Sequence, residues 1–500
     1  MKLKLPLYVY KLSYYFVGIV LFLGFMQRPA KAQSIVNEAY YDSITYQYYQ
    51  QKNWKTLIDT GSWMQKQGLD YYYLRMRMGI ACLELQKTAK AETHFRQALS
   101  FKTADAPAIL LLSKSLNYQM KNVEAGSLFQ KMTKEYQQQS GMKSGFRPVS
   151  AHLDIGTVNR GSENGLDFVE LAGSEGIFGQ EHFYHNNQFY DAGLYFQSNP
   201  QWLMYVGAQY ISIVATDRFA YLENNLLLDS VVTSSSGDAY YYKITNDERL
   251  VDFDHQLTQK ALYFQLQWAG SDRWSLVSSL QLFQAKRDFT IPDQKLETIT
   301  DTAFYDSSTG SLELFETELS KTTFSTVAWK TNDYSLSLHG KYHVGIFTAT
   351  GGLTKASVND SSAFQINAGY QINPLGNLKL VHQGEFLYLN MDSRSSSAYR
   401  FMLGWRPGKR TSLEVDYLFG HLNNLSEQFS YIVYNNPETV SSRVEASASY
   451  MVSKHLQLQL RYRLHEYQRR YDYFSDDTDL ETDYYTTKSN TLIGGIKWIF

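Results

Sequence analysis

The chain has 500 residues, and its 47 basic and 49 acidic side chains leave a formal net charge of -2, which offers no basic surface for nucleic acid. Only 9 prolines and one cysteine occur, so disordered, collagenous and disulfide-rich classes are excluded. The mean hydropathy of -0.37 and the lack of any apolar run of about 18 residues exclude a polytopic helical membrane protein. These values do not exclude a membrane β-barrel, because alternating strands average to a polar hydropathy.

The first residues have the three parts of a secretory signal. Lys2, Lys4 and Lys11 precede an apolar stretch over residues 14–26, and Ala30 and Ala32 form a small-x-small cleavage pattern. The alternative, an uncleaved membrane anchor, needs a longer apolar core to span comfortably. We expect residues 1–32 to be a cleaved signal peptide and the mature chain to be exported.

Residues 33–140 have a helical hydrophobic period. A small residue and an aromatic recur 34 residues apart, the spacing of one helix-turn-helix repeat in which small side chains let two helices approach. The residues expected to pack in this way are Gly79, Ala91, Phe95, Ala98, Ala125 and Phe129.

This stretch resembles tetratricopeptide repeats. Gly61 stands where the first hairpin would carry its phenylalanine, which suggests a degenerate capping repeat. The resemblance implies a periplasmic helical domain with a concave surface that binds a protein partner or cargo. The alternative is a plain helical bundle that serves as a spacer.

After Gly141 the hydrophobic period changes from helical to alternating and stays so to the end. In the last strand Leu492, Ile496 and Trp498 share one face, and the chain ends on Phe500. A final amphipathic strand with a C-terminal phenylalanine resembles the signal read by the machinery that assembles outer-membrane barrels. Residues 141–500 are therefore predicted to form an antiparallel transmembrane β-barrel in the outer membrane of a Gram-negative bacterium.

Turn-forming residues indicate how many strands there are. Six short turns and two terminal strands give about 14 strands, although strand counts of 12 and 16 are not excluded. The longer connections would face outward, with the longest over residues 217–256, and the helices would lie in the periplasm. The short turns begin at Ser198, Gly270, Thr331, Asn373, Arg406 and Val452.

Six of the eight tryptophans lie near a short turn or the C-terminus. Indole rings concentrate at membrane interfaces, so these residues predict a one-sided aromatic girdle at the periplasmic rim. The predicted girdle consists of Trp202, Trp268, Trp274, Trp329, Trp405 and Trp498, of which Trp498 also belongs to the assembly signal with Phe500.

A barrel of 14 strands should enclose a lumen that is open unless something plugs it, and the loop over residues 217–256 is the expected plug. Charges of opposite sign face each other on neighbouring strands. They either stiffen the wall as cross-strand ion pairs or form a charged constriction that selects what passes. These candidate lining residues are Glu414, Asp416, Arg443, Glu445, Arg461 and Arg463.

The sequence carries no convincing catalytic, cofactor or metal motif, so we expect no enzyme. His339 and His343 share a strand face, but residues four apart on a strand are about 13 Å apart, too far to bind one metal. His182 and His185 have no partner at informative spacing. The acidic segment over residues 476–483 could chelate calcium, but it lacks the glycine of a tight calcium loop, and such charge runs are more often simply solvated.

Helical repeats followed by an outer-membrane barrel resemble the surface lipoprotein assembly modulators and the exopolysaccharide export porins. The resemblance implies a translocation conduit or porin whose repeats recruit periplasmic cargo or partners for export. Outer-membrane lipid and the barrel-assembly machinery are the other expected partners, and nucleic acid is not one. The alternative is a non-conducting accessory or scaffold subunit bound to other outer-membrane proteins.

Overall fold

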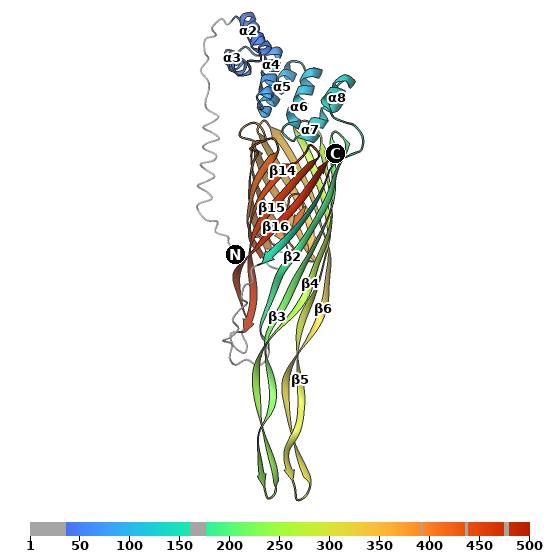
Figure 1. Ribbon diagram of the computed structural model, residues 1–500, viewed down its shortest axis with the longest axis vertical. Helices are drawn as coiled ribbons and strands as arrows, with labels where there is room; N and C mark the ends of the chain where they lie inside the picture. The colour runs from blue at the N-terminus through green and yellow to red at the C-terminus, as the bar shows by residue number, and fades with distance from the viewer. Residues whose placement is uncertain (1–36, 161–176, 392–393, 436–438, 475–479) are drawn as a thin grey trace.

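The computed structural model describes residues 37–160, 177–391, 394–435, 439–474 and 480–500, so the expected signal peptide lies outside the described residues. A group of helices covers one end of a closed β-barrel, and two long hairpins project from the opposite end (Figure 1). None of the described helices has both the length and the apolar character needed to cross a membrane.

Seven α-helices and one 3-10 helix precede the barrel in the described chain. Asp105 caps the fifth of the α-helices by accepting from the backbone N–H of Ala108 at 3.0 Å, and proline follows in the first turn, where its missing N–H costs nothing. The helices are α2 (Glu38–Gln50), α3 (Trp54–Lys66), α4 (Tyr72–Glu84), α5 (Thr88–Phe101), α6 (Ala106–Asn117), α7 (Asn122–Ser127), η1 (Phe129–Lys131) and α8 (Lys134–Ser140).

Helices α4 and α5 pack closely because Gly79 lacks a side chain. A Cβ at Gly79 would lie 2.5 Å from Cε1 of the fully buried Phe95. Phe129 differs from its counterpart Phe95, because α7 ends after 6 residues and Phe129 lies half-buried in η1. The three predicted packing alanines are fully buried: Ala91, Ala98 and Ala125.

Fourteen antiparallel strands close into one barrel, which confirms the predicted count. β1 pairs with both β2 and β16, and this pairing closes the sheet. The strands are β1 (Arg147–Arg160), β2 (Ile177–Asn199), β3 (Trp202–Ser234), β4 (Gly237–Ala269), β5 (Trp274–Asp306), β6 (Ser311–Val344), β7 (Phe347–Val358), β8 (Ser361–Ile372), β9 (Leu380–Met391), β10 (Arg394–Trp405), β11 (Thr411–Gly420), β14 (Thr439–Met451), β15 (Leu456–Phe474) and β16 (Leu480–Ile499).

The outer surface of the wall is apolar, as alternation predicts. On β15, the alternate residues Leu458, Leu460 and Tyr462 are exposed. The neighbouring Arg461 and Arg463 point inward and form ion pairs. A closed barrel leaves no unpaired sheet edge, so an apolar outer face of this kind can lie against hydrocarbon.

One predicted turn is wrong. Thr331 and Asp333 lie inside β6, where both side chains are buried against the lumen, and the chain turns instead at Gly345 and Ile346. Turn-forming residues are also polar, and here they serve as inward-facing wall residues. The predicted count of 14 strands is still correct, because the turn at Gly345 and Ile346 takes the place of the predicted turn at Thr331.

The correction moves one tryptophan out of the girdle. Trp329 lies in the middle of β6, where its ring contacts Phe289 at 6.1 Å, far from the turn at Gly345. The other predicted girdle residues lie at strand ends on the side that the helices cover. Rings of neighbouring strands are in contact there: Trp202 and Trp268 at 5.8 Å, and Trp268 and Trp274 at 5.2 Å.

The predicted plug is also wrong. Residues 217–256 belong to β3 and β4, whose ladder continues unbroken except for one bulge from Trp202 and Trp268 to Ser234 and Gly237. The resulting hairpin and the β5–β6 hairpin project away from the barrel (Figure 1). The aromatic contact between Phe219 and Phe324, at 5.4 Å, joins them at their base.

Candidate functional site

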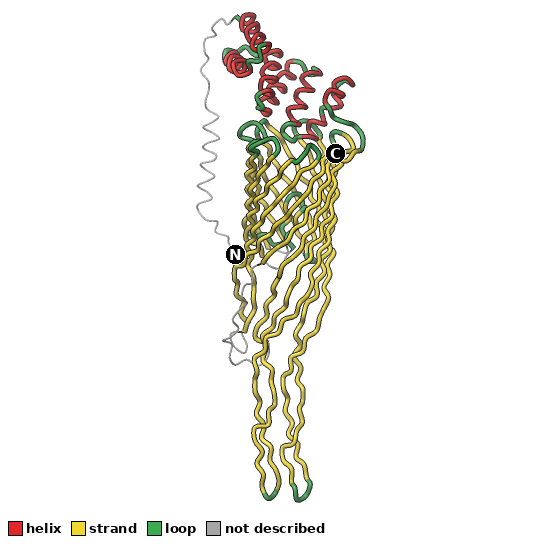
Figure 2. Tube along the Cα trace, viewed as in Figure 1, coloured by secondary structure: helices red, strands yellow, loops and turns green. Residues whose placement is uncertain are grey.

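The segment that enters the lumen is the connection between β11 and β14. Residues 421–435 fold back into the barrel, where Figure 2 shows loop inside the wall. Two short strands, β12 (Ser426–Glu427) and β13 (Ile432–Val433), pair to form a small hairpin. We call residues 421–435 the inward loop.

The tip of the inward loop is strained. Gln428, Phe429 and Ser430 have φ angles of 52°, 60° and 65°, the left-handed region that residues with a Cβ disfavour by roughly 1–2 kcal/mol each. Strain of this kind persists only where the surrounding contacts determine the conformation, and it concentrates at binding and switch regions. The tip is therefore held by its contacts with the wall.

A buried ion-pair cluster holds one side of the inward loop. Arg443 on β14 donates to both carboxylate oxygens of Glu427, with Nη1–Oε2 at 2.6 Å and Nη2–Oε1 at 2.8 Å. Arg400 on β10 lies 3.2 Å from Oε1 of Glu427, and Asp416 on β11 accepts from both arginines. Glu427 and Arg443 are 0% and 1% exposed, so each needs the other to offset the loss of hydration.

The tip reaches the opposite wall. The Tyr431 hydroxyl donates to Asp191 on β2, and the Tyr263 hydroxyl on β4 donates to the carbonyl of Phe429 at 2.9 Å. Ser430 accepts from Ser335 on β6 at 2.9 Å. Because contacts run from β10 and β14 to β2, β4 and β6, the inward loop crosses the lumen.

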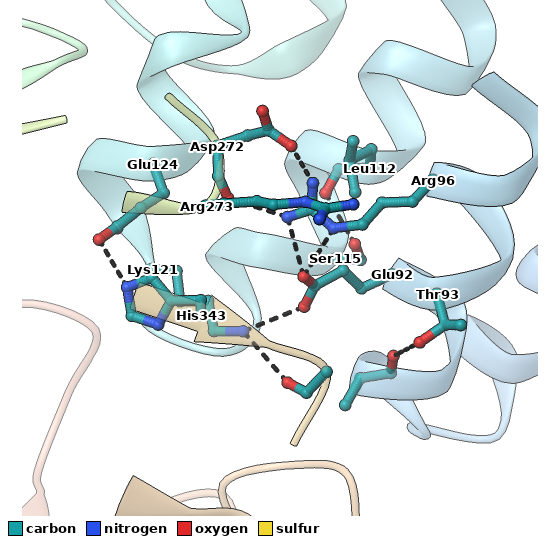
Figure 3. Close-up of polar contacts among 12 residues, drawn as sticks. Glu92, Thr93, Arg96, Leu112, Ser115, Lys121, Glu124, Asp272, Arg273 and His343 are labelled. Carbon is teal, nitrogen blue, oxygen red and sulfur yellow. Dashed lines mark hydrogen bonds and ion pairs between the residues drawn. The ribbon is translucent and has the colours of Figure 1, made fainter. Parts of the chain in front are cut away.

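The helices close the other end. Glu124 on α7 lies 2.9 Å from Nε2 of His343 at the end of β6 (Figure 3). It also accepts from the Ser275 hydroxyl at 2.6 Å. Burial alone would raise the pKa of the Glu124 carboxyl, but the hydrogen bond and charge of His343 and the Ser275 hydroxyl outweigh it and hold the pKa below its ordinary value. Glu124 is thus an anion that fastens α7 to the rim.

Further polar contacts around Glu124 hold the helices to the barrel rim. Lys121 donates to Glu92 at 3.0 Å and to the carbonyl of Gly345 at 3.3 Å, and Arg96 pairs with Asp272 in the β4–β5 turn (Figure 3). The backbone is close as well, because a Cβ at Gly126 would lie 1.8 Å from the carbonyl oxygen of Pro200.

Between the inward loop and the helices lies a chamber of about 660 Å³. Its wall carries charges of both signs, among them Glu385, Arg400, Lys341 and Asp191. Glutamine amides and tyrosine rings form much of the rest: Gln265, Gln267, Gln371, Gln383, Tyr195, Tyr205, Tyr263 and Tyr370. Such a surface offers donors, acceptors and flat rings to a polar solute.

The structure separates the six predicted lining residues into three groups. Glu414 and Arg461 line the chamber. Asp416 and Arg443 hold the inward loop, as described above. Glu445 and Arg463 pair with each other across β14 and β15 at 2.6 Å and stiffen the wall.

Sequence reasoning missed Glu427, Asp154, Asp191 and Glu124. Glu427 lies in a loop without periodicity, and its partners are brought to it only by the closed barrel. The alternation of β1 and β2 places Asp154 and Asp191 inward, so the period-2 signal applied to those strands would have found both.

A scan of protein-family models and a search of curated proteins find no match to this chain. Among solved structures, the chain is similar to the toluene transporter TbuX of Ralstonia pickettii, with 9% identity and a TM-score of 0.37 over 79% of this chain and 94% of that one. The toluene transporter TodX of Pseudomonas putida gives 7% identity and a TM-score of 0.34 over 70% and 89%.

The outer membrane protein Omp33 of Acinetobacter baumannii is similar over 71% of this chain and 100% of that chain, with 8% identity and a TM-score of 0.27. At such low identity and TM-score these similarities carry no conclusion about what this chain transports.

Proposed function

We propose that the protein is an outer-membrane channel whose passage is closed by its inward loop and capped by its helical domain. The observation that carries this proposal is the way in which the lumen is filled. A wall-to-wall loop anchored at Glu427 and Tyr431 occupies a lumen that the side chains of 14 strands alone would leave open.

The chamber indicates the class of solute. Its charges of both signs lie among amides and phenols, so no single sign of charge would be attracted strongly. A polar solute of low net charge, large enough to contact several wall residues in about 660 Å³, suits this lining best. Movement of the inward loop would connect the chamber to the outer side.

The helical domain would act from the periplasm. Its close Gly79–Phe95 packing is compatible with tetratricopeptide-like pairs, and large apolar side chains are exposed on it, among them Tyr40, Trp63 and Tyr73. We infer that this surface recruits a periplasmic protein partner or cargo, and that partner binding releases α7 from the rim.

The test is conductance of the full-length protein in a planar bilayer. A variant in which residues 422–434 are replaced by a short Gly-Ser linker should conduct continuously, whereas the unaltered protein should be mostly closed. Migration as a heat-modifiable barrel on gels checks folding. If the loop-replaced variant folds and still does not conduct, the channel proposal is wrong.

Closure at both ends favours a second function, that of a non-conducting scaffold in a larger outer-membrane complex. The two projecting hairpins would then be its outer contact surfaces, since Leu227, Val232, Leu296 and Leu314 are exposed there. Copurification of other outer-membrane proteins, lost when the β3–β4 hairpin is shortened, would support the scaffold function.

A further inference from the structure

Three potential metal ligands meet on the chamber wall. His152 and Asp154 lie two residues apart on β1 and share its inward face, and Asp191 is the direct cross-strand partner of Asp154 on β2. When one donor atom is taken from each residue, the three atoms all lie within 4.8 Å of one another. Two carboxylates directly opposite each other repel, so this arrangement needs a reason.

Each carboxylate has one oxygen that is held and one that is not. Arg461 pairs with Oδ2 of Asp154, and the Tyr431 hydroxyl donates to Oδ2 of Asp191. Among the described residues, Oδ1 of each aspartate is buried without a hydrogen-bond partner, and the two residues are only 4% and 3% exposed. Metal-binding carboxylates are oriented in this way, with outer partners on one oxygen.

A neighbouring glycine leaves space for the free oxygen of Asp154. Opposite Asp154 on β16 stands Gly495, where a Cβ would lie 1.9 Å from Oδ1 of Asp154. Arg461 reaches Asp154 over this glycine from β15. Nε2 of His152 lies 3.4 Å from both the Tyr205 hydroxyl and Oδ2 of Asp191, and the Tyr205 hydroxyl lies 3.0 Å from the Tyr431 hydroxyl.

Lys497, opposite His152 on β16, is a further cation on this wall. Its ammonium lies 5.8 Å from the ring centroid of Tyr195 and, within the described part of the chain, forms no ion pair with either aspartate. His152, Asp154, Asp191 and Lys497 all line the chamber, so a hydrated ion within the chamber can reach them.

We propose that His152, Asp154 and Asp191 bind one divalent first-row transition-metal ion of the Zn²⁺ type. Imidazole nitrogen with two carboxylates suits Zn²⁺ and its neighbours, whereas Ca²⁺ and Mg²⁺ prefer all-oxygen sites. The fourth position is open to water from the chamber. Because Asp191 also accepts from Tyr431, the ion lies where the inward loop meets the wall, and this site does not depend on the transport proposal.

The experiment uses full-length protein in detergent, stripped with a chelator, and Co²⁺ as a visible probe. We expect one Co²⁺ per chain to survive gel filtration, with d–d absorption of a protein-bound ion that Zn²⁺ removes and Ca²⁺ does not. Asp191→Asn and His152→Gln each remove a ligand while keeping shape, and each should weaken binding at least about tenfold.

The matched controls are Glu414→Gln and His339→Gln, which alter an inward carboxylate and an inward imidazole outside the cluster. Both should bind as the unaltered protein does, and every variant is first shown to be a heat-modifiable barrel. Absence of bound Co²⁺ and Zn²⁺ in the folded protein, or equal binding by Asp191→Asn and Glu414→Gln, would overturn the proposal. So would retention of Ca²⁺ in preference to Zn²⁺.

Discussion

Glu427 and Arg443 face each other through two hydrogen bonds of 2.6 and 2.8 Å, and both side chains are almost fully buried inside the lumen. One belongs to the inward loop and the other to the wall, so this pair joins the two parts that would have to separate if the proposed passage opens. Breaking a buried pair by removing one charge costs about 3–5 kcal/mol, because the other charge stays buried.

Glu427→Gln should therefore loosen the inward loop and raise the open probability in a planar bilayer. Glu414→Gln is the matched control, since Glu414 lines the chamber and, among the described residues, accepts from the Ser412 hydroxyl instead of from an arginine. Equal conductance of the two variants would show that the Glu427–Arg443 pair does not hold the inward loop in place. The double change Glu427→Met with Arg443→Met removes both charges and should restore much of the closure.

The contact between Glu124 and His343 predicts an acid dependence of helical docking. The pKa of Glu124 is lowered, so its contribution is complete above the ordinary value of 4.5 and is lost as pH falls through the lower pKa of the docked state. Spin labels at Gln130 and Lys454 should keep a narrow distance distribution at neutral pH and broaden as the pH falls from 4.5 through the lowered pKa of Glu124. Glu124→Gln should broaden it already at neutral pH and abolish the acid step; an unchanged acid step would show that another group is responsible.

Close backbone contact at the rim makes Gly126 sensitive to any side chain. Gly126→Ala would place a methyl group 1.8 Å from the Pro200 carbonyl oxygen, and such overpacking costs about 1–3 kcal/mol. We expect trypsin to cleave at Lys131 faster in this variant. Gly408→Ala is the control, because nothing lies within 4 Å of a Cβ there, and equal cleavage rates in the two would contradict the packing argument.

The two phenylalanines of the helical repeat should differ in their contribution to stability. Phe95→Ala empties a fully buried site against Gly79 and should cost about 3–5 kcal/mol of unfolding free energy in the helical domain. Phe129→Ala should cost clearly less, because Phe129 is half-buried in a 3-10 turn. Thermal melting of the helical circular dichroism signal compares them, and equal losses would mean that both sites are core.

The Phe500 side chain makes little contact with the rest of the barrel. Its side chain is 57% exposed, and its backbone N–H donates to the carbonyl of Val149 at 3.1 Å. Deletion of Phe500 should reduce the amount of assembled barrel in the outer membrane, whereas Phe500→Tyr should keep most of it. Normal levels after deletion would remove the assembly-signal interpretation.

Local patterns determined most of the architecture. Alternation over segments such as residues 456–464 follows from having lipid on one face and polar lumen on the other, so strands and their count could be predicted from sequence. The clustering of Trp202, Trp268 and Trp274 at one rim is equally local, since each indole lies beside its own turn.

Tertiary structure alone decided which segment enters the lumen. Residues 217–256 became a projecting hairpin because they pair with each other, and the inward loop fills the lumen because Glu427 meets arginines from two other strands. Asp154 and Arg461 are 307 residues apart in sequence and form a pair only because closure pairs β1 with β16, which brings Asp154 within reach of β15 on the far side of β16. Periodicity reports which face a residue occupies, but ion pairs across a lumen depend on which strands the closed barrel makes neighbours.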